Sequence, residues 1–223
     1  MRILAVDTSS EHGSVCVAGD EEVLGEVRLA ASLQHAERLF RSVEFLFQRL
    51  PFRLSDVDLF VAARGPGSFT GLRIGLAAME GFAAAHGKPA AGVTTLEALA
   101  WKTGIEGTRI VPTIDARRGE VYGAVYYRIG KILIEEQSAA VLKPAEWFAS
   151  LPRQPLVFCG SGAIRYRSEL AGEPDWRIHP MDFYLASAIA ELAGTSNCGP
   201  LQPLYVRRTE AEIARESIVG PNS

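Results

Sequence analysis

Short apolar segments bounded by turn residues come first along the chain, and longer amphipathic segments follow them. The short segments predict β-strands at residues 2–7, 14–18, 22–29 and 59–63. Apolar residues three and four apart then predict a helix over residues 33–50, with one stripe made of Leu33, Ala36, Phe40, Val43, Phe47 and Leu50. Leu39, Phe45 and Leu46 lie outside this stripe. A second helix is predicted from Phe69 to Ala85.

The second half repeats this order of elements. The pattern predicts strands at residues 110–115, 120–128, 132–135 and 156–159, and helices at 145–151, after Gly160 and at 183–193. In both halves an aspartate ends the first strand and glycines follow the fourth. We therefore predict a duplicated α/β fold with one domain over residues 1–103 and a related domain over 104–223.

Composition narrows the class of protein. The 223 residues are 48% hydrophobic and 22% charged, which is typical of a folded chain. A net charge of −3 excludes a strongly basic nucleic-acid binder. Three widely spaced cysteines indicate no disulfide framework, and the most apolar stretch, residues 74–85, is too short to cross a membrane. A soluble, cytoplasmic protein is expected.

The segment from Arg64 to Gly75, RGPGSFTGLRIG, is the strongest local motif. Its glycines allow a sharp turn with exposed N–H groups, and Ser68 or Thr70 could cap the following helix, which together is typical of an anion site. Neither standard nucleotide-binding motif is complete, because Leu72 stands where a P-loop needs lysine and Thr70 stands where the dinucleotide fingerprint needs glycine. A loop that only joins a strand to a helix remains an equal alternative.

Small residues lie along one side of the helix after this loop, at Gly71, Gly75 and Ala78. A glycine inside a helix costs about 1 kcal/mol against alanine, so a close neighbour must offset that cost. The neighbour could be the helix at residues 33–50 or a helix of a second chain. With Leu39 and Leu46 outside the first stripe, we expect an exposed helical surface for a partner, with plain core packing as the alternative.

Candidate chemistry is otherwise sparse. Asp7 and Asp115 end equivalent strands and could approach a magnesium nucleotide or anion; the candidate residues are Asp7, Thr8, Ser9, Gly67, Ser68, Asp115 and Arg117. Solvated charge after a strand is the alternative for Asp115 and Arg117. Position i+4 from His35 is Leu39, so the two-histidine helical metal motif is absent and no metal site is predicted.

Four segments resemble the bacterial TsaB family. They are Asp7-Thr8-Ser9, Gln34-His35-Ala36-Glu37, the glycine motif, and Gly92-Val93-Thr94-Thr95-Leu96-Glu97-Ala98-Leu99. The resemblance implies the actin/Hsp70/sugar-kinase-like fold. It also implies a non-catalytic subunit that supports its paralogue TsaD in threonylcarbamoylation of the tRNA adenosine next to the anticodon.

The same resemblance implies partners. They are TsaD, bound through the N-terminal helices, the ATPase TsaE, tRNA through the complex, and a second copy when TsaD is missing. We place the partner surface at His35, Leu39, Leu46, Gly71, Gly75 and Ala78. No cofactor of its own is expected, with ATP and magnesium only in the assembled complex, because Thr8-Ser9-Ser10 and Ala116-Arg117 replace the glycine-containing phosphate turns.

Two other functions stay open. One is an independent ATPase or phosphotransferase with Asp7 and Asp115 around a magnesium nucleotide. The other is a metallopeptidase, which is disfavoured because the sequence offers no ligand set.

Overall fold

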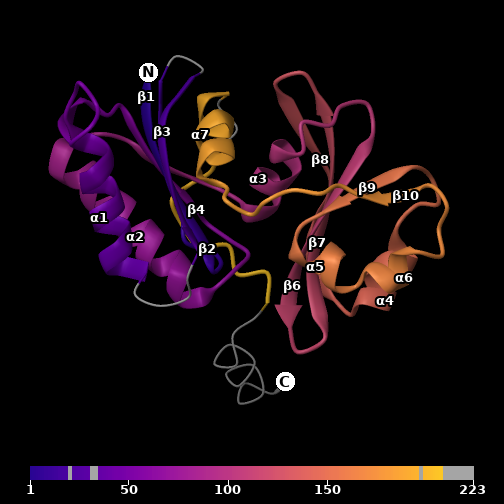
Figure 1. Ribbon diagram of the computed structural model, residues 1–223. Coiled ribbons are helices and arrows are strands. Elements are labelled where there is room, and N and C mark those ends of the chain that lie inside the picture. Colours follow the sequence, from indigo (N-terminus) through magenta and orange to yellow (C-terminus); the bar gives the residue numbers. More distant parts are fainter. Residues whose placement is uncertain (20–21, 31–34, 196–197, 208–223) are drawn as a thin grey trace, which may run out of the picture.

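Two five-stranded sheets form the frame of the molecule (Figure 1), and the computed structural model describes residues 1–19, 22–30, 35–195 and 198–207. The first sheet has the order β3-β2-β1-β4-β5, and the second has the order β8-β7-β6-β9-β10. In each sheet the central strand pairs antiparallel with the strand that follows it and parallel with the fourth strand. The predicted duplicated α/β fold is therefore confirmed.

The strands of the first sheet are β1 (Arg2–Asp7), β2 (His12–Gly19), β3 (Glu22–Ala30), β4 (Leu59–Ala63) and β5 (Ala90–Val93). Those of the second are β6 (Arg109–Arg117), β7 (Glu120–Ile129), β8 (Ile132–Leu142), β9 (Leu156–Cys159) and β10 (Trp176–Ile178). The strands predicted at residues 2–7, 59–63 and 156–159 have the predicted bounds. The short strands β5 and β10 were not predicted.

Helices cover both sheets. They are α1 (His35–Phe47), α2 (Phe69–His86), α3 (Thr95–Lys102), α4 (Pro144–Ser150), α5 (Ser161–Arg165), α6 (Arg167–Leu170) and α7 (Ala186–Gly194), with a 3₁₀ turn at Leu54–Asp56. In Figure 1, α1 and α2 lie outside the first sheet, α3 and α7 lie between the sheets, and α4, α5 and α6 lie beyond the second sheet. Sequence reasoning missed α3, which a capping box of Thr94 and Glu97 starts.

The last helix crosses back to the first half. Although α7 follows β10 in the chain, it packs on β1, β2 and β4. Its side chains share a core with the first sheet, α2, α3 and residues of β6, β7 and β9, and a second core lies between the second sheet and α4. The boundary between two domains at residue 103 stays a prediction. Helix α7 belongs to the second domain by sequence but packs on the first sheet.

The phase of helix α1 differs from the prediction. Leu39, Val43 and Leu46 are buried on the sheet, whereas Phe40 and Phe45 are each 50% exposed. Phe40 was assigned to the stripe by its spacing of four from Ala36 and three from Val43. The structure instead places its ring edge-to-face against Phe82 of α2, with the ring centroids 5.8 Å apart.

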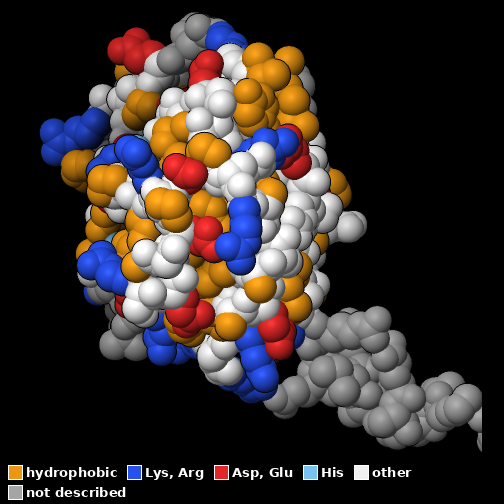
Figure 2. All heavy atoms as spheres, turned by 90° about the vertical axis from the view of Figure 1, so that its right-hand side faces the viewer, with side chains coloured by type: hydrophobic (Ala, Val, Ile, Leu, Met, Phe, Trp, Pro, Cys, Tyr) orange, Lys and Arg blue, Asp and Glu red, His pale blue; other side chains and the backbone are white. Residues whose placement is uncertain are grey.

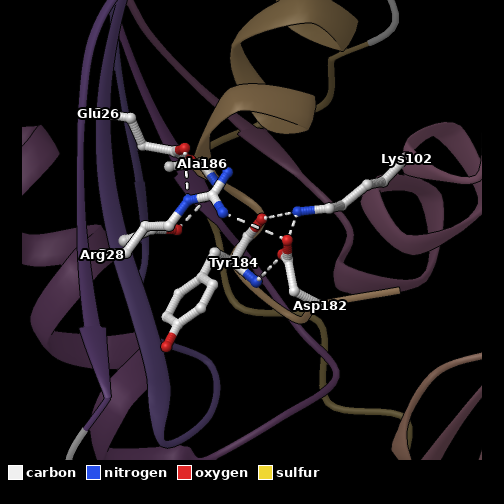
Figure 3. A network of polar contacts seen from close by, with 7 residues as sticks. Glu26, Arg28, Lys102, Asp182, Tyr184 and Ala186 are labelled. Carbon is white, nitrogen blue, oxygen red and sulfur yellow. Dashed lines mark hydrogen bonds and ion pairs between the residues drawn. The ribbon is translucent and has the colours of Figure 1, made fainter. Parts of the chain in front are cut away.

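The connection from β10 to α7 is tied down by a polar network (Figure 3). Asp182 forms an ion pair with Lys102 at the end of α3, and Lys102 also donates to the carbonyl of Tyr184 at 2.5 Å. Arg28 of β3 pairs with Glu26 at 2.8 Å and reaches Asp182 at 3.3 Å. Burial raises the pKa of Asp182, but the hydrogen bond from Lys102 and further contacts outweigh it, so the pKa lies below its usual range. This network fixes the connection against both α3 and the first sheet.

Within the described residues, every helix is too short or too polar to cross a lipid bilayer.

Candidate functional site

The glycine loop between β4 and α2 packs directly on the turn after β1. The Ser68 N–H donates to the Ser9 carbonyl at 2.7 Å, and Thr8 Oγ1 donates to the Gly71 carbonyl at 2.7 Å. A Cβ at Gly67 would lie 2.6 Å from the Ser9 carbonyl oxygen, and one at Gly71 would lie 1.9 Å from the Thr8 carbonyl oxygen. The glycines are therefore needed for close contact between two segments of the same chain.

This packing corrects the interpretation of the small residues that lie along one side of α2. Gly71 and Gly75 are buried, and a Cβ at Gly75 would lie 2.4 Å from Thr8 Oγ1. The close neighbour that offsets the two glycines is Thr8, and not another helix or a second chain. The N-terminus of α2 is capped from within, since Ser68 Oγ accepts from the Gly71 N–H at 3.3 Å. The loop thus uses some of the N–H groups that an anion would need.

The second half repeats this close packing. Gly160 has φ of 97°, and a Cβ there would lie 2.5 Å from the Thr113 carbonyl oxygen. A Cβ at Gly162 would lie 2.8 Å from the Thr113 side chain. In both halves, glycines after the fourth strand let a helix start close to the end of the first strand.

A cleft of about 680 Å³ lies between the halves. It brings together five of the candidate anion-binding residues, which are Ser9, Gly67, Ser68, Asp115 and Arg117. The other two, Asp7 and Thr8, line a separate cavity of about 10 Å³ beside Arg38. The two aspartates that sequence symmetry places together therefore do not share one site.

Asp7 is completely buried at the end of β1. Its Oδ1 accepts a hydrogen bond from the Ser9 N–H at 2.8 Å, and its Oδ2 has no hydrogen-bond partner among the described residues. Burial raises the pKa of this carboxyl from 3.8 to about 6, although the hydrogen bonds from Ser9 act in the opposite direction. Because Asp7 is completely buried and lines a cavity of about 10 Å³ instead of the cleft, its carboxyl is poorly placed to reach a metal ion in the cleft.

Asp115 is held by its own half. Its carboxylate pairs with Arg165 at 3.0 Å and accepts from the Arg117 N–H at 3.0 Å. Arg117 and Arg118 have positive φ values of 59° and 54°, which non-glycine residues seldom adopt. A turn that binds phosphate needs exposed backbone N–H groups, and this turn carries the two large arginine side chains instead. Within the described part of the chain no three His, Cys, Asp or Glu side chains gather as a metal site.

The predicted partner residues lie mostly inside the chain. Leu39, Leu46, Gly71, Gly75 and Ala78 are all buried against their own fold, and the side chain of His35 lies outside the described residues. The prediction that these five residues contact a partner is therefore wrong, because their side chains or backbone are buried in the core of the first half.

Other side chains form the surface that α1 and α2 present to solvent. We define the outer face as Phe40 and Phe45 of α1 with Ala77, Gly81 and Ala84 of α2, all of which are exposed. A Cβ at Gly81 would have no atom within 4 Å. The spacing of four and three between Ala77, Gly81 and Ala84 is present in the sequence, but small residues lie on several sides of this helix, so the sequence does not show which of them face outward.

Comparisons with known proteins agree with this fold. A solved structure of the ethanolamine utilization protein EutJ from Carboxydothermus hydrogenoformans matches 86% of this chain and 90% of that chain, with a TM-score of 0.51 at 14% identity. The structure called YeaZ from Pseudomonas aeruginosa matches 92% of this chain and 99% of that chain, with a TM-score of 0.79 at 29% identity. The duplicated sheets and the cleft define the actin/Hsp70/sugar-kinase-like class.

Sequence relatives specify the family. The model of the family described as "TsaD: tRNA N6-adenosine threonylcarbamoyltransferase" matches residues 25–174. The tRNA threonylcarbamoyladenosine biosynthesis protein TsaB of Escherichia coli is 39% identical over 65% of this chain and 63% of its own length. TsaB of Bacillus subtilis is 31% identical over 72% of this chain and 71% of its own length. The chain belongs to the TsaB family, as its motifs predict, and the match spans slightly less than two thirds of the E. coli protein.

Proposed function

We propose that this chain is a non-catalytic subunit in tRNA threonylcarbamoyladenosine synthesis and that it binds TsaD through the outer face of α1 and α2. The observation that carries the proposal is that two phenylalanines of α1 stand half exposed, one of them against Phe82 of α2, and that a stripe of small residues on α2 is exposed as well. Exposed apolar surface of this kind marks a contact site, and small residues let a helix of the partner approach closely. The names of the relatives supply the pathway.

The non-catalytic role is supported by what fills the cleft. Asp7 is buried beside a separate small cavity, Asp115 pairs with Arg165, and Arg117 occupies the second phosphate turn. A catalytic centre needs groups that converge on the reacting atoms, and these groups are turned apart or engaged elsewhere.

The rival function, an independent ATPase or phosphotransferase, has a direct test. We expect millimolar magnesium–ATP to leave the melting temperature of the isolated chain unchanged, because neither aspartate is available for the metal. Binding at a hundred times Kd would add about 2.7 kcal/mol, which corresponds to a readily measured thermal shift. A clear upward shift, or turnover of ATP by the isolated chain, would revive the rival.

Substitutions at Gly81 separate partner binding from folding. A residue added there meets open space, and both alanine and arginine are better helix formers than glycine by roughly 1 kcal/mol. Gly81→Ala and Gly81→Arg are therefore expected to raise the melting temperature by about 2–4 °C. Only Gly81→Arg should block TsaD, because its long charged side chain prevents close helix packing.

The measurement is size-exclusion chromatography with light scattering on each variant, alone and mixed with TsaD of the same organism. We expect wild type and Gly81→Ala to form the mixed complex and Gly81→Arg to elute separately. A Gly81→Arg complex of normal affinity would exclude this face. A wild-type chain that fails to bind TsaD, with or without TsaE, would overturn the proposed function itself.

The remaining partners follow from this role. TsaE and tRNA are proposed to reach the chain through the assembled complex in the cytoplasm, and a second copy is proposed to occupy the outer face when TsaD is missing. Basic and acidic side chains are interspersed on the face of the second half (Figure 2), which does not favour direct electrostatic capture of tRNA there.

A further inference from the structure

The described C-terminal residues 199–207 run from the first half to the second, where Arg207 lines the cleft, and we call this segment the strap. It leaves α7, passes the first sheet and approaches the end of β6 in Figure 1. Gly199 exchanges two backbone hydrogen bonds with Gly92 of β5, at 2.8 and 3.0 Å, and the Leu204 N–H donates to the Arg64 carbonyl at 2.7 Å. The strap is thus bound to the first half along its backbone.

Tyr205 adds a side-chain contact at the start of α2. Its ring lies 5.5 Å from the ring of Phe69, and its hydroxyl accepts from Arg73 Nε at 3.2 Å. The Arg73 guanidinium in turn stacks 3.9 Å above the Phe69 ring. This cluster holds the strap at the edge of the cleft that Phe69 lines.

Arg207 then reaches the second half. It forms an ion pair with Glu120 at the start of β7 and lies 5.8 Å from the ring centroid of Tyr122. The Arg207 and Glu120 side chains are 29% and 35% exposed, and Tyr122 and Arg207 both line the cleft. This contact joins the halves at the cleft, whereas Lys102 and Asp182 tie together the two chain connections between the halves.

We infer that the strap is a latch that holds the two halves at a fixed opening of the cleft, with Arg207 as its releasable end. The backbone hydrogen bonds keep the strap on the first half, whereas a partly exposed ion pair of modest strength closes it on the second. Because α3 of the first half packs on β6, β7 and β8, the halves can move relative to each other only by rotation about this contact, and a second contact beside the cleft limits that rotation. A subunit held in one shape loses less conformational freedom when it binds a partner.

Charge reversal tests the latch. Arg207→Glu and Glu120→Arg each replace attraction with repulsion, and the double variant restores an ion pair with its polarity exchanged. Spin labels at cysteines replacing the exposed residues Thr70 and Glu146, with Cys198→Ser, report the distance between the halves. We expect each single variant to raise the population of longer distances about five-fold, and the double variant to return it to the wild-type level.

A matched control breaks an ion pair that does not cross the cleft. Arg153 pairs with Glu173 at 3.1 Å, and both belong to the second half. Arg153→Glu is expected to leave the distance distribution unchanged. The latch is refuted if the single variants keep the wild-type distribution, if the double variant stays as open as the singles, or if Arg153→Glu opens the cleft equally. None of these results depends on TsaD.

Discussion

Gly71→Ala is expected to destabilise the fold by about 4 kcal/mol or more, which is at the extreme of single substitutions. The added methyl carbon would lie 1.9 Å from the Thr8 carbonyl oxygen, and that oxygen belongs to the backbone. Relief therefore requires α2 to move away from the end of β1. Such a movement would also break the hydrogen bond from Thr8 Oγ1 to the Gly71 carbonyl.

Gly75 provides the matched comparison, because its neighbour is a side-chain atom. A Cβ at Gly75 would lie 2.4 Å from Thr8 Oγ1, which Thr8→Ala removes. Urea unfolding of the single and double variants should show that Thr8→Ala partly rescues Gly75→Ala and does not rescue Gly71→Ala. Stability of Gly71→Ala within 1 kcal/mol of wild type would contradict the packing of this loop.

The glycine loop shows where sequence reasoning reached its limit. The position of the loop between a strand and a helix follows from local pattern, because turn residues interrupt two periodic segments. What the glycines contact does not follow, since Thr8 and Gly71 are 63 positions apart and meet only when β1 and β4 pair. An anion site and a close contact between two chain segments both require glycines, so the local sequence cannot distinguish them.

Helix α1 shows a similar limit in its phase. The buried positions Leu39, Val43 and Leu46 are spaced four and three apart, as are several of the residues in the predicted stripe. Leu39 and Leu46 extend the apolar side of the helix beyond the predicted stripe, so periodicity alone could not select which of the apolar residues face inward. The exposed pair, Phe40 and Phe45, is the part of the chain that a partner explains better than the isolated fold does.

The order of elements was more predictable than the site because it depends on local patterns. Long alternating strands such as β2 and β7 have a strong periodic signal, whereas the four residues of β5 and the three of β10 are too short to have one. The aspartates were found by position, but their roles depend on burial and partners. Asp7 is completely buried, and Asp115 forms an ion pair with Arg165, and neither fact can be read from the sequence.

Asp7→Asn is expected to change the pH dependence of stability by about 3 kcal/mol. Burial raises the pKa of this carboxyl from 3.8 to about 6, and two pKa units correspond to roughly 3 kcal/mol. The folded state holds the proton more tightly than the unfolded state. Ionised Asp7 therefore costs stability, which falls as the pH rises from about 4 to above 6. Asparagine keeps the acceptor for Ser9 and does not ionise.

The quantity to measure is the difference in unfolding free energy between Asp7→Asn and wild type, from urea titrations at several pH values. This difference should move in favour of the variant between about pH 4 and pH 7, whatever its starting value, because the Asp7 carboxyl is the only ionisable group that the substitution removes.

Asp58→Asn is the opposing control, because the pKa of Asp58 is lowered, chiefly by a hydrogen bond from the Arg2 backbone N–H. The stability that its ionised form contributes is present above the ordinary pKa and lost as the pH falls, so the Asp58→Asn difference should shrink in acid. A pH-independent difference for Asp7→Asn would mean that this carboxylate ionises normally in the folded state, and it would contradict the cost of its burial.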